Sequence, residues 1–459
     1  MGERLACWPR RPERHSFKGH SPLLKKSPRV DDFVEQLRGS KGVDSQGSFS
    51  IDRDRALRLM AEKSLPFPYA WLVALGQAVF HSGSPKLEVK LTRLRVDFKF
   101  RYTRNTTSEE MERTFLDPTA DCEPAWQRLR KAVWGAALGE GREVSLTLGE
   151  RRFDWSKGQM TVGPLPQTSG TEACFSAGLK TTRIKTALWK TVAALRARTD
   201  LTSEIKLRFF ASPFQVTLDG VRVDGLHRNP GNGFSPRNRP FSVFWLQGED
   251  PLTLPPAQSE GWEEPYPNSP LQFLSRGLKL HPSTESVAGA VLLTAHASTG
   301  LEHGSSGDVV WSAHKRPSTI YWVRQGATVG KEILPWGKLS VSLALVLSAD
   351  NLRSDLTGFG LEQEGRKQRR LLYLKQIKER LEGFDWDPAL ADLDSRSATL
   401  KKSVGSMVLG LVGLPFTHGA TFILVAAGVA GVVLNSGVAG VQRTLVRDYA
   451  KLRERLDRE

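Results

Sequence analysis

A run of 38 consecutive residues without Asp, Glu, Lys or Arg, from Val404 to Val441, constrains the fold of this chain most strongly. A helix on the surface of a soluble domain needs a polar face, and this run carries no charge to supply one. The segment from Ala420 to Val441 would rise about 33 Å as a helix, which is enough to cross the hydrocarbon layer of a membrane. The run therefore predicts a membrane segment.

The charges beside the run favour a helical hairpin with both ends in the cytoplasm. Lys401 and Lys402 precede the run, and Arg443 and Arg447 follow it, so positive charge lies at both ends. Pro415 marks a break between the two legs. The first leg is short for a full span, so a re-entrant leg, a single crossing, or a hairpin buried in a soluble core are the alternatives.

Two segments next to the run are predicted to be amphipathic helices. In "GRKQRRLLYLKQIKERLEGF", Leu371, Leu374, Ile377 and Leu381 recur at helical spacing among Lys and Arg. A second stripe follows the run and consists of Val441, Leu445, Tyr449, Leu452 and Leu456. We expect both stripes to pack within the protomer, with a homotypic contact as the alternative, and both helices to lie near the membrane.

The net charge of +16 indicates anionic partners, either phospholipid headgroups or nucleic acid, with a solvated basic surface as the commoner alternative. Nucleic acid is the less favoured of the two, because the charge is scattered and no nucleic-acid-binding motif is recognised. With 39% apolar residues over 459 positions, the chain can bury two or three cores, which excludes a disordered protein. Residues 1–48 are the exception, since they form a basic segment with few apolar positions.

The sequence predicts neither a disulfide framework nor a metal site. Cys7, Cys122 and Cys174 are odd in number and widely separated, which favours a reducing compartment. His296, His303 and His314 fall in one segment, but their spacing matches no metal-binding pattern.

The first folded region is predicted to be α+β, with two layers of helix on sheet. "PYAWLVALGQAVFHSG" indicates a largely buried helix that ends near Gly83. "KLEVKL" and "RLRVDFKFRY" alternate apolar and charged residues, as strands with one buried face do. "EVSLTLGERRFDW" predicts a hairpin that turns at Gly149 and Glu150.

This order of elements resembles the GHKL superfamily of gyrase, histidine kinases and HtpG-type heat-shock chaperones. The similarity continues through "SGTEACFS" to "FFASPFQVTLDGVRVDG". Farther on, "IYWVRQGATVGKEILPWGKLSVSLALVLSADNLRSDLTGFGLEQ" resembles the middle domain of that chaperone. Together the resemblance covers about residues 49 to 363, and it depends on order and spacing rather than on one motif.

The resemblance implies a nucleotide site whose residues are largely missing. Members that hydrolyse ATP carry Glu and Asn on the first buried helix, where this chain offers Gln77 and no acid. Asp97 corresponds to the family's adenine-binding Asp, but the glycines that should follow it are absent. Gln77 and Asp97 are therefore vestigial candidates for cofactor binding, and no catalytic residue is predicted.

The stretch "SADNLRSDLTGFGLEQ" is similar to the chaperone loop that supplies an arginine toward the γ-phosphate. Gly358 appears at that position, although a shift of register would let Arg353 serve. A loop with glycine at this position keeps the shape of the family's loop but lacks the arginine's positive charge, which predicts that ATP hydrolysis is lost.

These observations predict five segments. They are a basic disordered tail (1–48), a degenerate GHKL ATPase-like domain (49–225), a chaperone middle-domain-like α/β domain (226–363), a basic amphipathic helix with a linker (364–400), and a membrane hairpin with a C-terminal amphipathic helix (401–459).

The predicted function is that of a membrane-tethered, non-catalytic binding or scaffold protein, a pseudo-ATPase with no cofactor and with its soluble domains on the cytoplasmic side. Contact with anionic lipid headgroups, an unidentified protein partner and a homodimer are further expectations. The alternatives are a chaperone-like ATPase that binds ATP and Mg²⁺, and a basic nucleic-acid-binding protein.

Overall fold

The computed structural model describes residues 65–102, 110, 113–115, 122–156, 159–164, 172–179, 187–226, 239–248, 252, 279–280, 287–301, 309–355, 357, 359–382 and 440–459. The predictions for the basic tail and for almost all of the uncharged run fall outside these residues. None of the helices in the described part is long and apolar enough to cross a membrane.

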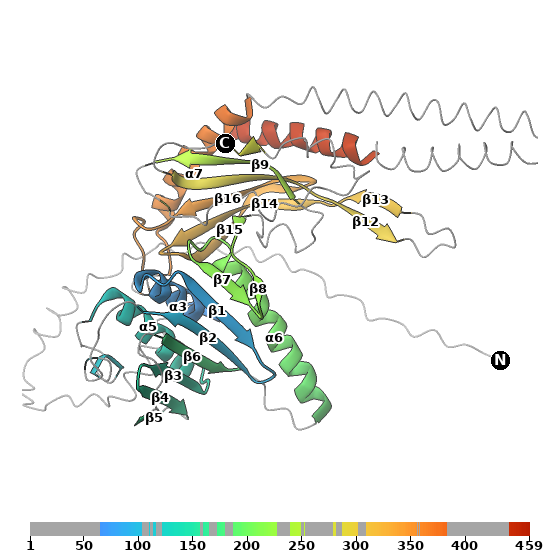
Figure 1. Ribbon diagram of the computed structural model, residues 1–459. Coiled ribbons are helices and arrows are strands. Elements are labelled where there is room, and N and C mark those ends of the chain that lie inside the picture. Colours follow the sequence, from blue (N-terminus) through green and yellow to red (C-terminus); the bar gives the residue numbers. More distant parts are fainter. Residues whose placement is uncertain are drawn as a thin grey trace, which may run out of the picture. The chain divides into compact units, whose positions relative to one another are not determined.

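Eight strands form the first sheet, in the order β5-β4-β3-β6-β2-β1-β7-β8 (Figure 1). All neighbours in it are antiparallel except β1 and β7. Its strands are β1 (Lys86–Leu91), β2 (Arg95–Arg101), β3 (Val144–Leu148), β4 (Arg151–Ser156), β5 (Gln159–Pro164), β6 (Glu172–Gly178), β7 (Gln215–Leu218) and β8 (Val221–Arg222).

The predicted hairpin between β3 and β4 is confirmed. Leu148 pairs with Arg151, which leaves Gly149 and Glu150 as a two-residue loop. Gly149 has a φ of 55°, a conformation that such tight turns require and that glycine adopts without steric cost. The alternating strands β1 and β2 are confirmed too, since their apolar residues are buried and most of their charged residues are exposed.

The helices packed with the first sheet are α3 (Ala70–His81), α5 (Pro124–Trp134) and α6 (Ala187–Phe209), and a π-helical turn, η1 (Gly135–Gly139), extends α5. Ten of the twelve residues of α3 are buried, because this helix is apolar on every side and packs among several elements. A Cβ atom at Gly76 would lie 2.5 Å from Cε1 of Phe209, so glycine permits the close approach of α6. The two-layer helix-on-sheet prediction is confirmed for this region.

Six strands form the second sheet, in the order β10-β9-β11-β16-β14-β15. Its strands are β9 (Arg239–Gln247), β10 (Lys279–Leu280), β11 (Val287–Ala295), β14 (Arg316–Arg324), β15 (Ala327–Leu339) and β16 (Val341–Ser348), and a separate pair consists of β12 (Ala297–Leu301) and β13 (Val309–Ala313). Between residues 227 and 362 the described residues form strands and turns without an α-helix.

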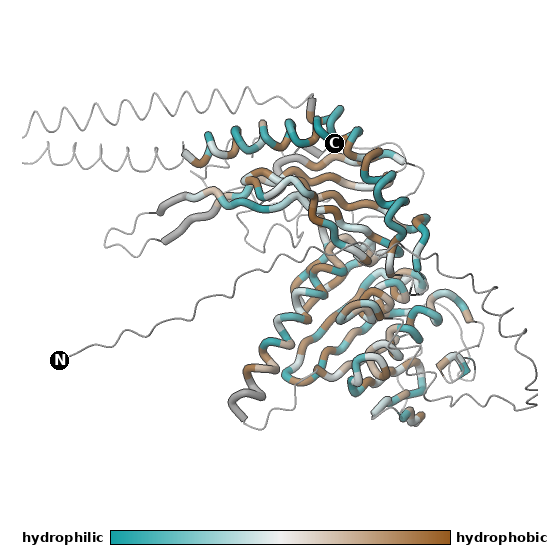
Figure 2. Tube along the Cα trace, turned by 180° about the vertical axis from the view of Figure 1, so that it is seen from behind, coloured by the Kyte–Doolittle hydropathy of each residue, from teal (hydrophilic) through white to brown (hydrophobic). Residues whose placement is uncertain are grey.

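Two helices after residue 362 complete the core of the second sheet: α7 (Gln363–Glu382) and the C-terminal helix, residues 440–458. The predicted stripe of the C-terminal helix is confirmed, since Val441, Leu445, Tyr449, Leu452 and Leu456 are all buried in the core that contains the odd-numbered residues of β16. Figure 2 shows the apolar strands of this sheet beside the more hydrophilic helices.

The stripe predicted for α7 is wrong at one position. Leu374, Ile377 and Leu381 are buried, but Leu371 is 40% exposed and Tyr373 takes a buried place instead. At 100° per residue, Leu371 lies about 100° from the centre of the stripe that these four buried residues form.

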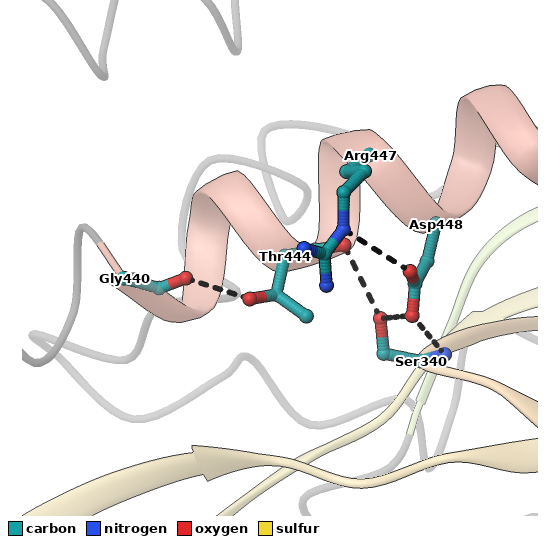
Figure 3. Close-up of polar contacts among 5 residues, drawn as sticks. All are labelled: Ser340, Gly440, Thr444, Arg447 and Asp448. Atoms are coloured by element: carbon teal, nitrogen blue, oxygen red, sulfur yellow. Dashed lines mark hydrogen bonds and ion pairs between the residues drawn. The ribbon is translucent and has the colours of Figure 1, made fainter.

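A buried carboxylate holds the C-terminal helix to the turn between β15 and β16 (Figure 3). One oxygen of Asp448 accepts hydrogen bonds from the backbone N–H of Ser340 at 2.9 Å and from its hydroxyl at 2.8 Å. Asp448 is 1% exposed. Charge-assisted hydrogen bonds of this kind are stronger than neutral ones, so this contact fixes the register of the helix on the sheet.

Replacing Asp448 with Ala should lower the free energy of unfolding by about 2 to 4 kcal/mol, because the buried N–H of Ser340 would lose this acceptor and its hydroxyl would keep only the long contact of 3.5 Å with the carbonyl of Thr444. Urea unfolding of the full chain measures this. Asp457→Ala is the matched control, since Asp457 makes an ion pair with Lys378 at the surface; its cost should stay below about 1 kcal/mol. Equal losses for the two variants would contradict the role given to Asp448.

A buried histidine lies near the same turn. The backbone N–H of His296 donates to the carbonyl of Ser340, and its Nε2 lies 2.7 Å from the hydroxyl of Ser342. Burial, followed by the neighbouring Arg316 and His314, lowers the pKa of His296 to about 3. The imidazole is therefore neutral in the folded protein at physiological pH.

His296 should make stability depend on pH in the acid range. The unfolded chain takes up a proton near pH 6.5 and the folded chain does so only near 3, so stability is lost as the pH falls through this window. The slope due to His296 is about 1.4 kcal/mol per pH unit. Urea unfolding as a function of pH should show a shallower loss for His296→Gln than for the wild type. The exposed His314, replaced in the same way, should leave the slope nearly unchanged.

Candidate functional site

The space where α3 meets the first sheet is filled by aromatic side chains. Trp71 of α3 lies with its ring centroid 5.8 Å from Phe98 on β2 and 5.7 Å from Phe175 on β6. Phe98 and Phe175 lie 5.9 Å apart, and all three side chains are inaccessible to solvent. Aromatic rings at these separations are in van der Waals contact. A nucleotide base therefore has no open cleft at this point of the interface.

The register of the sheet continues this apolar surface across five strands. Val89 pairs with Phe98, Phe98 with Phe175, and Phe175 with Leu146, which in turn pairs with Phe153. Residues that face one another across strands point to the same side of a sheet. The row therefore presents one continuous apolar layer to the helices.

Asp97 lies on the other face of the same sheet. It follows the buried Val96 and precedes the buried Phe98, and neighbouring residues of a strand point to opposite sides. Its carboxylate accepts a hydrogen bond of 2.6 Å from the hydroxyl of Ser176. Its other cross-strand neighbour is the exposed Lys90. The vestigial adenine-binding candidate therefore belongs to a polar outer surface rather than to the interface with α3.

Gln77 is on α3 and is completely buried. Neither its Oε1 nor its Nε2 has a hydrogen-bond partner within the described part of the chain. A buried amide normally finds a partner, since leaving one unpaired costs about 1 to 3 kcal/mol. The structure thus does not bring the two sequence candidates together: Gln77 lies in the helix layer, and Asp97 points away from it.

The stretch around Gly358 forms a narrow loop that returns to the first domain. Ser354 and Leu361 make an isolated antiparallel bridge, and the N–H of Asp355 donates to the carbonyl of Gly360. Lys131 of α5 donates from Nζ to the carbonyl of Thr357. Its ammonium also lies 4.2 Å from the ring centroid of Phe359, a cation–π contact. Arg353 is exposed, and Gly358 lies outside the described residues.

This contact is part of a basic cluster, which we define as Arg128, Lys131 and Arg324. Burial, together with the charges of Arg128 and Arg324, lowers the pKa of Lys131 to about 8, while the charge of Asp355 acts in the opposite direction. Burial and the charge of Arg324 also lower the pKa of Arg128. Burial and mutual repulsion both raise the free energy of three cations held close together. A bound anion would offset this repulsion, so the cluster is a candidate site for an anion.

Asp355, whose charge acts on Lys131, is already engaged within the loop. A carboxylate oxygen of Asp355 accepts hydrogen bonds from the hydroxyl of Thr357 at 2.5 Å and from the N–H of Gly360 at 3.2 Å. The Nε of Arg324 is buried and makes no hydrogen bond within the described part of the chain, although its Nη2 donates to the carbonyl of Asp350. The cluster can therefore attract a phosphate or carboxylate group.

The described residues contain no group of three or more His, Cys, Asp or Glu side chains that is arranged to hold a metal ion. His303 and Cys7 lie outside these residues. Cys122 and Cys174 form no disulfide in the described part of the chain.

Comparison with known proteins gives distant structural likenesses. No protein-family model matches the sequence, and no curated protein matches it. The ATPase domain of the mismatch repair endonuclease MutL from Aquifex aeolicus is 9% identical, over 66% of this chain and 96% of that chain, with a TM-score of 0.30. The N-terminal domain of a DNA repair protein is 8% identical, over 72% and 99%, with a TM-score of 0.32.

A variant of the Aquifex aeolicus MutL ATPase domain is also similar, with 9% identity over 62% of this chain and 91% of that chain and a TM-score of 0.27. At these identities and TM-scores, the likeness carries no conclusion about activity or ligands. The resemblance to a chaperone middle domain stays a prediction.

The depressed pKa of Lys131 gives the basic cluster a measurable property. The folded protein loses this proton near pH 8, while the unfolded chain keeps it to about 10.5. Folding is therefore favoured as the pH rises through this window. The unfolding free energy of the wild type should increase relative to that of Lys131→Met between these two values. Lys99→Met, on the exposed outer face of the first sheet, is the matched control, and coincident pH profiles for wild type and Lys131→Met would contradict the assignment.

Proposed function

We propose that this chain is a non-hydrolysing binding module with an ATPase-like architecture, tethered to a membrane on its cytoplasmic side. The observation that supports the first part is the packing of Trp71 against Phe98 and Phe175. ATP hydrolysis needs a carboxylate or imidazole beside the attacking water and a cleft for the base. Here α3 carries no carboxylate, and its one imidazole, His81, lies at its C-terminal end against the ring of Phe80. Aromatic rings occupy the interface of α3 with the sheet.

The polar candidates support the same proposal. Gln77 cannot act as a general base, because an amide does not take up a proton at physiological pH. Asp97 lies on the opposite face of the sheet, so its carboxylate does not reach the interface between α3 and the sheet. A fold without these catalytic groups can still bind a partner, and its exposed loops and strand faces provide the surface for this.

The tether rests on the sequence of the run from Val404 to Val441, which lies almost wholly outside the described residues. Its lack of charge and its length are the reasons for proposing it.

A second candidate function is binding of a phosphorylated ligand without hydrolysis, and the basic cluster favours it. Arg128, Lys131 and Arg324 come from two elements and meet at the loop that follows β16, with Asp355 as the acid that acts on Lys131. Phosphate groups suit such a site, because they can accept several charge-assisted hydrogen bonds at once.

Thermal unfolding with Mg-ATP, adenosine or tripolyphosphate, together with phosphate release, separates these functions. We expect no phosphate release above that of the buffer and no stabilisation by adenosine. If the basic cluster binds phosphates, ATP and tripolyphosphate should stabilise the protein equally, by about 2.7 kcal/mol at a hundredfold excess over Kd. Arg324→Gln should abolish that effect, while the matched Arg95→Gln on the first sheet should not. Turnover of ATP, or stabilisation by adenosine, would contradict the proposal.

A further inference from the structure

The C-terminal helix carries a row of exposed cations, which we call the basic stripe: Arg443, Arg447 and Lys451. Residues four apart lie on one side of a helix, so these three side chains form a single line. The buried residues Val441, Leu445, Tyr449, Leu452 and Leu456 occupy the side that packs on the second sheet. The basic stripe therefore faces away from the core.

The hydrogen bonds of Asp448 keep the basic stripe in this orientation. Figure 3 shows Asp448 turned toward Ser340, with Arg447 beside it. The Nε of Arg447 lies 3.7 Å from the carboxylate, yet the arginine side chain is 61% exposed and the aspartate side chain 1%. Asp448 is the one acid between residues 440 and 451. The first three turns of the helix therefore present only positive charge to the solvent.

The acids farther along the helix are engaged in contacts of their own. Glu454 pairs with Arg458 at 2.5 Å, and Asp457 pairs with Lys378 of α7 at 3.0 Å. Glu459 accepts a hydrogen bond of 3.1 Å from the indole of Trp336. Each of these acids is thus engaged by a partner outside the basic stripe.

Helix α7 exposes apolar and basic side chains together. Leu371 and Leu372 are 40% and 54% exposed, and Lys367 and Lys375 are exposed one turn before and one turn after Leu371. Leucines among lysines suit the boundary between lipid headgroups and acyl chains, where apolar tips enter and cations meet phosphates. A surface that binds nucleic acid has no use for the exposed leucines.

The sequence places the C-terminal helix at the end of the uncharged run and α7 before it, with residues 383–403 between α7 and the run. The run from Val404 ends at Val441, two residues before the basic stripe begins, and α7 precedes it. We propose that the basic stripe, together with Lys367, Leu371, Leu372 and Lys375 of α7, binds the surface of an anionic lipid bilayer. This inference deepens the proposed tether, but it depends on charge and not on whether the run spans the membrane.

Flotation of the full chain with lipid vesicles tests the proposal. Vesicles of phosphatidylcholine alone are compared with vesicles that also contain phosphatidylserine, at low and at high salt. We expect the wild type to bind the anionic vesicles at least about tenfold more tightly than the neutral ones, with the difference reduced at high salt.

The test variant is Arg443→Gln/Arg447→Gln/Lys451→Gln. Since each cation near an anionic surface contributes about fivefold to affinity, removing three should weaken binding to anionic vesicles by about a hundredfold. Lys90→Gln/Arg95→Gln/Lys99→Gln, on the exposed outer face of the first sheet, removes the same charge and should keep most of the preference. Thermal unfolding of both variants shows that they remain folded.

One outcome supports the proposal and three overturn it. A preference for anionic vesicles that disappears in the test variant and persists in the control variant supports the proposal. Equal binding of wild type to both vesicle types, or equal losses in the two variants, overturns it. Loss of affinity for labelled DNA or RNA in the test variant, with vesicle binding unchanged, also overturns it. The tether is tested separately: if it is wrong, neither the wild type nor the two variants should bind neutral vesicles.

Discussion

Successive residues of a strand point to opposite faces, and in β2 this constraint sends Phe98 toward α3 and Asp97 away from it. The rest of the first domain depends on that division. One face becomes a continuous apolar row from Val89 to Phe153, on which Trp71 can pack, and the other becomes a polar surface with Asp97 and Ser176. Because the aromatic rings hold helix and sheet together, the contact that stabilises the domain also fills the interface where a base would need room.

Local sequence patterns were sufficient to predict the elements whose structure depends on residues close together in the chain. The alternation of β1 and β2, the turn at Gly149 and Glu150, and the stripe of the C-terminal helix all depend on spacings of a few residues. The failure at Leu371 has a local cause as well, because Tyr373 completes the buried stripe of α7 in its place. The resemblance to the GHKL superfamily added the order of helices and strands, but not the face on which Asp97 lies.

The basic cluster could not be predicted in this way. Arg128 and Lys131 look like the solvated side of α5, and Arg324 looks like the end of a strand. They meet only because the loop after β16 folds back onto α5, through the contacts of Lys131 with Thr357 and Phe359. The position of Asp448 has the same origin, since a carboxylate in a basic helix appears to be an ordinary surface charge until its partner Ser340 is known. Long-range partners such as these leave no periodic signal in the sequence.

The separation of 108 residues between Ser340 and Asp448 has a consequence for biosynthesis. A ribosome that adds about 5 to 20 residues per second needs about 5 to 20 s to make the residues between them. During that interval the strands of the second sheet have emerged without the helix that covers them, and their apolar side chains are open to other chains. Cotranslational protection by a chaperone would therefore matter most for this half of the protein, and least for the first sheet, whose helices are made before or soon after its strands.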